Sequence, residues 1–220
     1  MVGDSLFNVI LSGTGETLLM VLLSTALGYF IGLPMGILLT VSDSSGIAPN
    51  AFLYKILDGV VNITRSIPFL ILLILIQPIT KLIVGKSYGT VATVVPLTVA
   101  AAPLIARMVE SSLKEVDKGV IEAAISMGAG KLLIVKKVLI PEAKISLLIG
   151  VTISLGTILG YSAMAGVVGG GGLGDIAIRY GYYRYETKVM LITVFVLVLL
   201  MQVLQYIGNY LSKRYDRRKA

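Results

Sequence analysis

The chain has 220 residues, of which 56% are hydrophobic and 14% are charged, and its mean hydropathy is +0.91. Globular domains carry about 25% charged residues, so this composition excludes a soluble domain and indicates an integral membrane protein. Cysteine and histidine are both absent, which argues against an enzyme or a metal site, and no catalytic or metal-ligating residue is expected. The net charge of +7 comes from basic residues at the ends of apolar runs, a placement that fits membrane topology and not nucleic-acid binding.

Five apolar segments meet or approach the length of a membrane helix, which is about 20 residues for a hydrocarbon core of about 30 Å. In chain order they cover residues 18–41, a segment centred on 67–79, and residues 91–108, 145–168 and 189–207. Pro68 and Pro78 are expected to kink or end the second segment, because each lacks a backbone donor. The sequence therefore predicts an all-α integral membrane fold with five transmembrane helices, and residues 1–220 form a single domain.

Basic residues are concentrated in two places, and short loops rich in Lys and Arg stay on the cytoplasmic side of a membrane. The segment between the third and fourth predicted spans holds Arg107, Lys114, Lys118, Lys131, Lys136, Lys137 and Lys144, and the C-terminal tail holds Lys213, Arg214, Arg217, Arg218 and Lys219. Five spans then place the N-terminus outside, together with the loops at 81–86 and 169–188. Arg65, Arg107 and Glu110 are expected near the cytoplasmic edge of the membrane, where charges cost little.

A polar and basic segment, residues 114–144, interrupts the apolar chain between the third and fourth spans. Asp117 is a suitable N-cap for a helix that begins near Lys118, and Gly128 or Gly130 can adopt the left-handed conformation that ends a short helix. A second helical piece is expected over residues 131–139, before Pro141. Apolar and small residues recur at helical spacing as one narrow stripe, formed by Ile121, Ile125, Gly128 and Leu132.

Two functions fit such a segment. Lys131, Lys136 and Lys137 would suffice to hold an amphipathic helix on anionic lipid, whereas small residues let another protein approach closely. The order Glu-Ala-Ala, three residues, Gly, nine residues, an aliphatic, one residue, an aliphatic, Pro resembles the cytoplasmic EAA signature of bacterial ABC-importer permeases. Its positions in this chain are Glu122, Ala123, Ala124, Gly128, Val138, Ile140 and Pro141. The resemblance implies cytoplasmic coupling helices that dock a separate ATPase, and it favours the docking interpretation.

The chain shows no nucleotide site of its own. A P-loop requires Gly, four residues, Gly-Lys and then Ser or Thr, so that backbone amides hold phosphate and the hydroxyl reaches magnesium. Ile125 replaces the first Gly of such a loop, and Leu132 replaces the hydroxyl residue after Lys131. No cofactor is therefore expected on this chain, and ATP and magnesium are expected on a partner ATPase.

A glycine-rich segment follows the fourth predicted span. Four consecutive glycines would break a helix, and irregular backbone at membrane depth is tolerated only where protein covers it or where it lines an aqueous cavity. A flexible external turn and a part of the translocation pathway or its gate are both open interpretations. The candidates for the pathway or gate are Pro68, Tyr161, Ser162, Met164, Gly169, Gly170, Gly171 and Gly172.

Four motifs together extend over nearly the whole chain: RSIPF at 65–69, PLTVAAAPLIARMVE at 96–110, the EAA segment, and GYSAMAGVVGGGGLGD at 160–175. They resemble the permeases of methionine ABC importers. The resemblance implies a homodimer in the bacterial cytoplasmic membrane, two copies of a separate ATPase and an extracytoplasmic methionine-binding protein. A permease for another amino acid or an osmoprotectant, with the same architecture, is the alternative.

Two other classes of protein fit the chain less well. An ion-coupled secondary transporter would place ionisable groups at mid-membrane and often repeat one half of its sequence, and neither feature is found. An intramembrane enzyme would need an activated nucleophile, but Ser154, Thr157 and Ser162 have no histidine to activate them.

Overall fold

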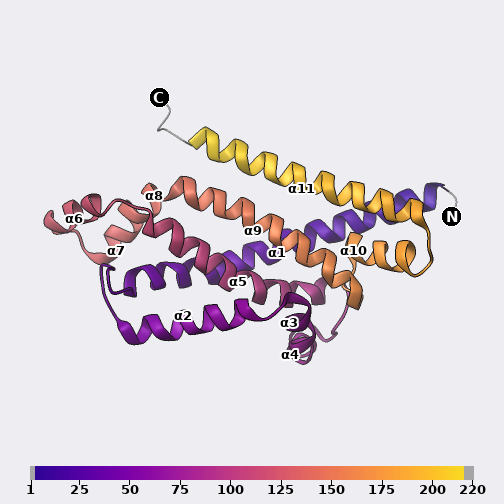
Figure 1. Ribbon diagram of the computed structural model, residues 1–220, viewed down its shortest axis with the longest axis horizontal. Coiled ribbons are helices and arrows are strands. Elements are labelled where there is room, and N and C mark those ends of the chain that lie inside the picture. Colours follow the sequence, from indigo (N-terminus) through magenta and orange to yellow (C-terminus); the bar gives the residue numbers. More distant parts are fainter. Residues whose placement is uncertain (1–2, 216–220) are drawn as a thin grey trace.

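Four long helices dominate the structure, a computed structural model that describes residues 3–215 (Figure 1). They are α1 (Gly3–Ser42), α5 (Thr90–Lys114), α9 (Lys144–Ala165) and α11 (Thr187–Tyr215), and each is long and apolar enough to cross a membrane. The bent pair α2 (Ala51–Ser66) and α3 (Phe69–Leu75), counted as one crossing, brings the total to five. No strand occurs among the described residues, so the expected all-α membrane fold is confirmed.

Short elements connect these long helices. α4 (Gln77–Val84) follows the bent pair, and α6 (Lys118–Ser126), α7 (Lys131–Ile134) and α8 (Ile140–Glu142) lie between α5 and α9. A π-helix, Val135–Leu139, joins α7 to α8, and a second one, Ala177–Tyr182, follows α10 (Gly172–Ile176). A 3-10 turn, Gly166–Val168, continues the end of α9.

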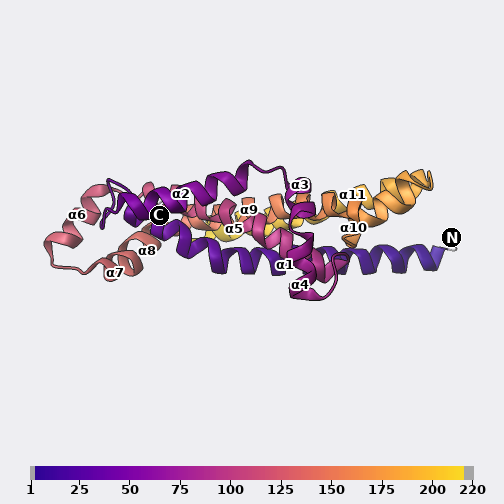
Figure 2. The same ribbon diagram turned by 90° about the horizontal axis from the view of Figure 1, so that it is seen from below.

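The two ends of the molecule carry different elements (Figure 2). α6 and α7 project beyond the long helices at one end, and the N-terminus lies at the opposite end, with α10 and the start of α11 on the same side. This arrangement agrees with the topology predicted from the basic residues, in which the N-terminus and the basic segment face opposite sides. Arg217, Arg218 and Lys219, which contributed to that prediction, lie outside the described residues.

The contact between α1 and α5 is the most extensive in the bundle, and glycines bring the two backbones together. A Cβ atom on Gly32 would lie 2.5 Å from the Ala102 carbonyl oxygen, and one on Gly36 would lie 2.5 Å from the Ala106 carbonyl oxygen. Small residues four positions apart, here Gly28, Gly32 and Gly36, are a common means of close helix packing in lipid. The G-x-x-x-G repeat is readable in the sequence, although hydropathy alone does not detect it.

The first helix begins earlier than hydropathy predicts. The expected span covers residues 18–41, whereas α1 begins at Gly3. Two polar residues before position 18 have distant partners: Glu16 accepts a hydrogen bond from Gly172 N at 2.7 Å, and Thr17 accepts one from Leu173 N at 2.9 Å. Each pair is separated by 156 residues, so no local sequence pattern reveals it.

The second predicted span is not a continuous helix. α2 ends at Ser66, α3 begins at Phe69, and the two are bent by 103°. Pro68 is the N-cap of α3, and Pro78 lies in the first turn of α4. Each proline thus stands where a helix starts and where its missing donor costs little.

Candidate functional site

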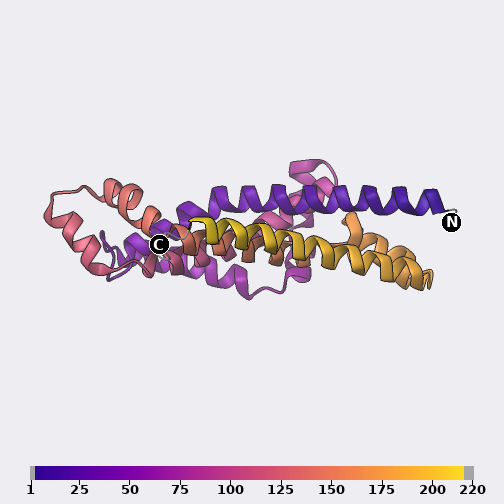
Figure 3. The same ribbon diagram turned by 90° about the horizontal axis from the view of Figure 1, so that it is seen from above.

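Residues 114–144, called the coupling segment below, form the end of the molecule at which α6 and α7 project (Figure 3). The first helix of the segment begins at Lys118, as predicted. The Asp117 side chain caps this helix by accepting a hydrogen bond from the Gly119 amide at 2.7 Å, which satisfies one of the free donors at a helix start.

The end of α6 is set by the glycine of the Glu-Ala-Ala signature. Gly128 N–H donates to the Ile125 carbonyl at 2.9 Å, and Ala129 N–H donates to the Ala124 carbonyl at 3.1 Å. These two bonds define a Schellman motif, in which the residue after the cap is left-handed, and Gly128 has a φ of +79°. Gly130 has a φ of −69°, so Gly128 alone of the two predicted candidates ends the helix.

The coupling segment has a buried face and an outward face. The buried residues Ala124, Ile134, Val135 and Leu139 belong to the main core, whereas Glu122, Ala123, Ile125, Met127, Gly128 and Leu132 are exposed. The predicted continuous stripe is wrong, because Gly128 ends α6 and leaves Ile125 and Leu132 on separate helices. A Cβ atom on Gly128 would meet no atom within 4 Å, so this position is open to another protein.

The last three signature residues lie where the coupling segment returns to the membrane helices. Val138 and Ile140 are half-buried and pack against the main core, and Pro141 is exposed in the first turn of α8. Val138 and Ile140 therefore anchor the segment to the core, and the ATPase contact expected for all three residues stays a prediction.

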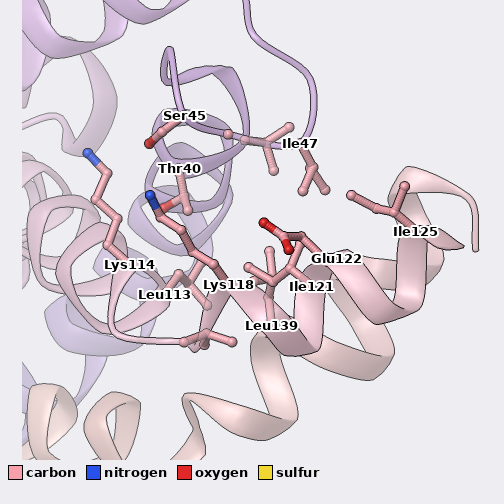
Figure 4. Close-up of a pocket in the computed structure, with 13 residues that line it drawn as sticks. Thr40, Ser45, Ile47, Leu113, Lys114, Lys118, Ile121, Glu122, Ile125 and Leu139 are labelled. Atoms are coloured by element: carbon pink, nitrogen blue, oxygen red, sulfur yellow. The ribbon is translucent and has the colours of Figure 1, made fainter.

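A cavity of about 270 Å³ separates α6 from the turn that follows α1 (Figure 4). Ile121, Glu122 and Ile125 line it from α6, and Ser45 and Ile47 line it from the turn. Because this space is open, α6 is supported mainly by its Ala124 face and not by the turn.

Beside this cavity, a chain of ion pairs joins α5 to α2 and to the turn after α1. Arg107 donates to Asp58 and to Glu110, both at 2.6 Å, and Lys114 donates to Glu110 at 2.9 Å and to Asp43 at 2.8 Å. Glu110 is only 3% exposed and each of its oxygens has a cationic partner, as a buried carboxylate requires. The cytoplasmic position expected for Arg107 and Glu110 fits their place in the last third of α5, beside the coupling segment.

Lys114 also fixes the charge of the turn after α1. Its hydrogen bond holds the pKa of the Asp43 carboxyl well below the usual range, and a hydrogen bond from the Ser45 amide at 2.9 Å adds to this effect. Asp43 therefore remains ionised at neutral pH, and its link to α5 is maintained.

The glycine-rich segment is packed against the outer ends of α1 and α5. Gly170 and Gly172 are buried, Gly171 is half-buried and Gly169 is exposed. Thr93 donates to the Gly170 carbonyl at 3.1 Å, and the Gly172 amide donates to Glu16 at 2.7 Å. Gly172 has a φ of +73°, and a Cβ atom there would lie 2.6 Å from Thr17 Oγ1. These contacts rule out a flexible turn, while a role in the pathway or gate stays a prediction.

The remaining pathway candidates lie at the α2–α3 break and in the last turns of α9. Tyr161, half-buried on α9, stacks on Phe69 with ring centroids 4.5 Å apart, so the structure brings Tyr161 close to Pro68 at the α2–α3 break. Ser162 is buried and donates to a carbonyl of its own helix at 2.8 Å, and Met164 is 51% exposed. Ser162 is thus a structural hydroxyl within α9.

Comparison with known proteins identifies the family of this chain. Residues 28–219 match the family described as the binding-protein-dependent transport system inner membrane component. The chain belongs to this family. It is therefore the permease subunit of an importer, and the coupling segment and the glycine-rich segment are parts of that permease.

The permease has relatives of nearly the same length. It is 50% identical over 211 residues to the probable D-methionine transport system permease protein MetI of Vibrio cholerae, with 96% of this chain and 94% of the relative covered. It is 43% identical over 205 residues to the protein of the same description from Pasteurella multocida, with 93% and 94% covered. A solved inward-facing structure of the MetNI methionine ABC transporter superposes with a TM-score of 0.96 at 46% identity, covering 99% of the permease and 100% of that chain.

Proposed function

We propose that this permease forms the translocation pathway of an ATP-driven methionine importer, as a homodimer bound to two copies of a separate ATPase in the bacterial cytoplasmic membrane. The observation that carries the proposal is the exposed coupling segment, in which Glu122, Ala123 and Gly128 lie on the outward face. The cargo is supported by the relatives named for D-methionine transport and by the likeness to the MetNI methionine ABC transporter.

In this function the partner ATPase holds ATP and magnesium. The permease supplies the surface that contacts the ATPase and is displaced with it. α6 follows α5 directly, and Glu110 ties α5 to α2 through Arg107 and Asp58. A displacement of α6 therefore acts on α5 and α2 together. Binding of ATP biases such a unit between inward-open and outward-open states, since a ligand shifts an equilibrium by its differential affinity for the two states.

The opposite end of the permease would receive cargo from an extracytoplasmic methionine-binding protein. The loop at 169–188 lies at this end, whereas α4 and the loop at 81–89, also expected to face the outside, lie beside α3 nearer the middle of the long axis. The hydrogen bonds that join Thr93 and Glu16 to the glycine-rich segment hold this surface of the permease rigid for docking of the binding protein.

Reconstituted vesicles test this function. We expect methionine to accumulate only when the ATPase, ATP and a methionine-binding protein are each supplied on the correct side. Concentrative uptake that needs no ATP and follows a proton or sodium gradient would overturn the proposal. ATP-driven uptake of another amino acid or an osmoprotectant, without uptake of methionine, would retain the importer and exclude methionine as its cargo.

A further inference from the structure

We propose that the cavity at the α2–α3 break binds the transported amino acid during its passage, with Arg65 holding the carboxylate and Phe69 and Tyr161 contacting the apolar side chain. The identity of the ligand rests on the function proposed above. The cavity has a volume of about 130 Å³, roughly ten times the space needed for one water molecule. α2, α3, α5 and α9 all contribute to its walls.

The cavity lies within the part of the bundle formed by the membrane-spanning helices, and Tyr161 lines it from the last turns of α9. Ala100 and Leu104 line it from α5, and both are near the middle of that 25-residue helix. Figure 1 likewise places the end of α2 and the start of α3 near the middle of the long axis. On this placement Arg65, near the end of α2, lies deeper than the cytoplasmic edge expected for it, and the chain turns sharply after Ser66.

Arg65 differs from the other arginine of this region in having no carboxylate partner. Arg107 is paired with Asp58 and Glu110, whereas Arg65 is exposed and takes part in none of the ion pairs within residues 3–215. A charged side chain at mid-membrane faces a water-filled cavity or a partner charge and not lipid. A guanidinium binds a carboxylate through two parallel hydrogen bonds, so an anionic group of the cargo would supply the missing partner.

The other walls of the cavity suit the rest of an amino acid. Irregular backbone at this depth, as at Pro68, is tolerated where it lines a cavity, and the carbonyls that end α2 carry the negative end of the helix dipole, which favours an ammonium group. Phe69, Leu104 and Tyr161 form an apolar and aromatic surface. Thioether sulfur packs favourably against aromatic rings. The combined chemistry is that of a zwitterion with an apolar side chain.

The absence of cysteine allows a direct test of binding. Leu104→Cys would be introduced into the permease assembled with its ATPase, and the rate of modification by a small thiol reagent would be measured on the permease band. We expect saturating methionine to slow the modification at least fivefold. Tyr185→Cys, on an exposed outer loop, is the matched control and should react at the same rate with and without methionine.

The role of Arg65 is tested in the same cysteine background. Arg65→Gln should abolish protection by methionine and raise the KM for uptake at least tenfold in complexes that assemble with the ATPase. Lys55→Gln, on the exposed start of α2, is the charge-matched control and should change neither quantity. Should Arg65→Gln fail to assemble, Ala100→Phe fills the cavity without removing the charge and should also abolish protection.

The outcomes separate this site from the proposed function. A parent complex that accumulates methionine with ATP but shows no protection at Leu104→Cys would overturn the site and leave the function intact. Full protection in both the Arg65→Gln and Ala100→Phe backgrounds would overturn it as well. A parent complex that accumulates no methionine at all would remove the cargo, and the assignment of this cavity with it.

Discussion

Glycine determines the backbone at both ends of the permease, but for different reasons. Gly128 in the coupling segment and Gly172 at the outer end both have left-handed φ values, +79° and +73°. A Cβ atom on Gly128 would meet nothing within 4 Å, whereas one on Gly172 would lie 2.6 Å from Thr17 Oγ1 and 2.8 Å from the methyl group of Met20. At the outer end, side chains of the permease itself fill the space around the glycine. In the coupling segment, the space around the glycine is empty and available to another protein.

Side-chain exposure shows the same difference between the two ends. In the coupling segment, Met127 is 81% exposed although it is apolar, and apolar surface of this kind marks an interaction site when it is contiguous. In the glycine-rich segment, the Gly170 carbonyl and the Gly172 amide are already hydrogen-bonded to Thr93 and Glu16 of the permease itself. Substitutions should therefore act on partner binding at one end and on folding at the other.

The largest expected effect concerns the side of the membrane on which each end lies. In cells that lack the ATPase, an impermeant thiol reagent should modify Tyr185→Cys at once and Met127→Cys only after the membrane is opened, because the two exposed positions lie at opposite ends. We expect the rates in intact cells to differ at least tenfold. Modification of Met127→Cys in intact cells would contradict the N-outside, five-span topology.

Gly172→Ala should strongly destabilise the outer end. A left-handed non-glycine residue costs about 1–3 kcal/mol, and the forced contact with Thr17 adds overpacking of similar size, so we expect a loss of about 3 kcal/mol. Gly169→Ala is the matched control, since Gly169 has a φ of +75° and free space around it; it should lose about 1 kcal/mol. Equal shifts in the thermal midpoint of the purified permease would show that packing plays no part.

Gly128→Leu should change partner binding more than folding. The strained φ costs the permease about 1 kcal/mol, while the added side chain enters the space left for the ATPase and should weaken its binding at least tenfold. Gly128→Asn tests the two effects apart, because asparagine tolerates the left-handed conformation, and it should retain binding within about threefold. Co-purification with the ATPase and stimulated ATP hydrolysis measure both variants; normal binding by Gly128→Leu would remove the docking role of this position.

The smallest expected effect is the pH dependence of the Asp43–Lys114 pair. The pKa of Asp43 is lowered in the folded permease, so the pair stabilises the fold above the unfolded pKa of about 3.9 and this contribution is lost as the pH falls further. Asp43→Asn should thus lower stability at pH 7 by at most about 1 kcal/mol, as for other partly exposed ion pairs. Thermal midpoints of parent and variant should begin to converge as the pH falls below about 4, and a gap at pH 2 as large as the gap at pH 7 would contradict this account.

Local signals in the sequence were sufficient to predict the coupling segment. The Asp117 cap and the Gly128 helix end each depend on residues no more than five positions apart, so they can be recognised without the fold. The apolar stripe through Leu132 failed because a regular helical spacing was continued past the glycine that ends the helix. The long helices α5, α9 and α11 were equally accessible, since hydropathy alone determines whether a segment crosses lipid.

Features that depend on distant residues could not be predicted in this way. Glu16 is compatible with the long first helix because Gly172 is its partner, and Arg107 is compatible with α5 because Asp58 on α2 pairs with it. The position of Arg65 beside a break in the helix depends on the 103° bend after α2, whereas hydropathy treats each span as straight. Pairing and bending are properties of the assembled bundle.

α1 is far longer than a bilayer is thick. Its 40 residues extend about 60 Å, twice the hydrocarbon thickness of about 30 Å, and the 25 residues of α5 extend about 38 Å. Because the glycines at 28, 32 and 36 lock the two backbones together, neither helix can slide past the other when lipid thickness changes. Hydrophobic mismatch would then be absorbed by tilting the pair, and we expect this tilt to change the orientation of α6, so that coupling to the proposed ATPase depends on the lipid composition of the membrane.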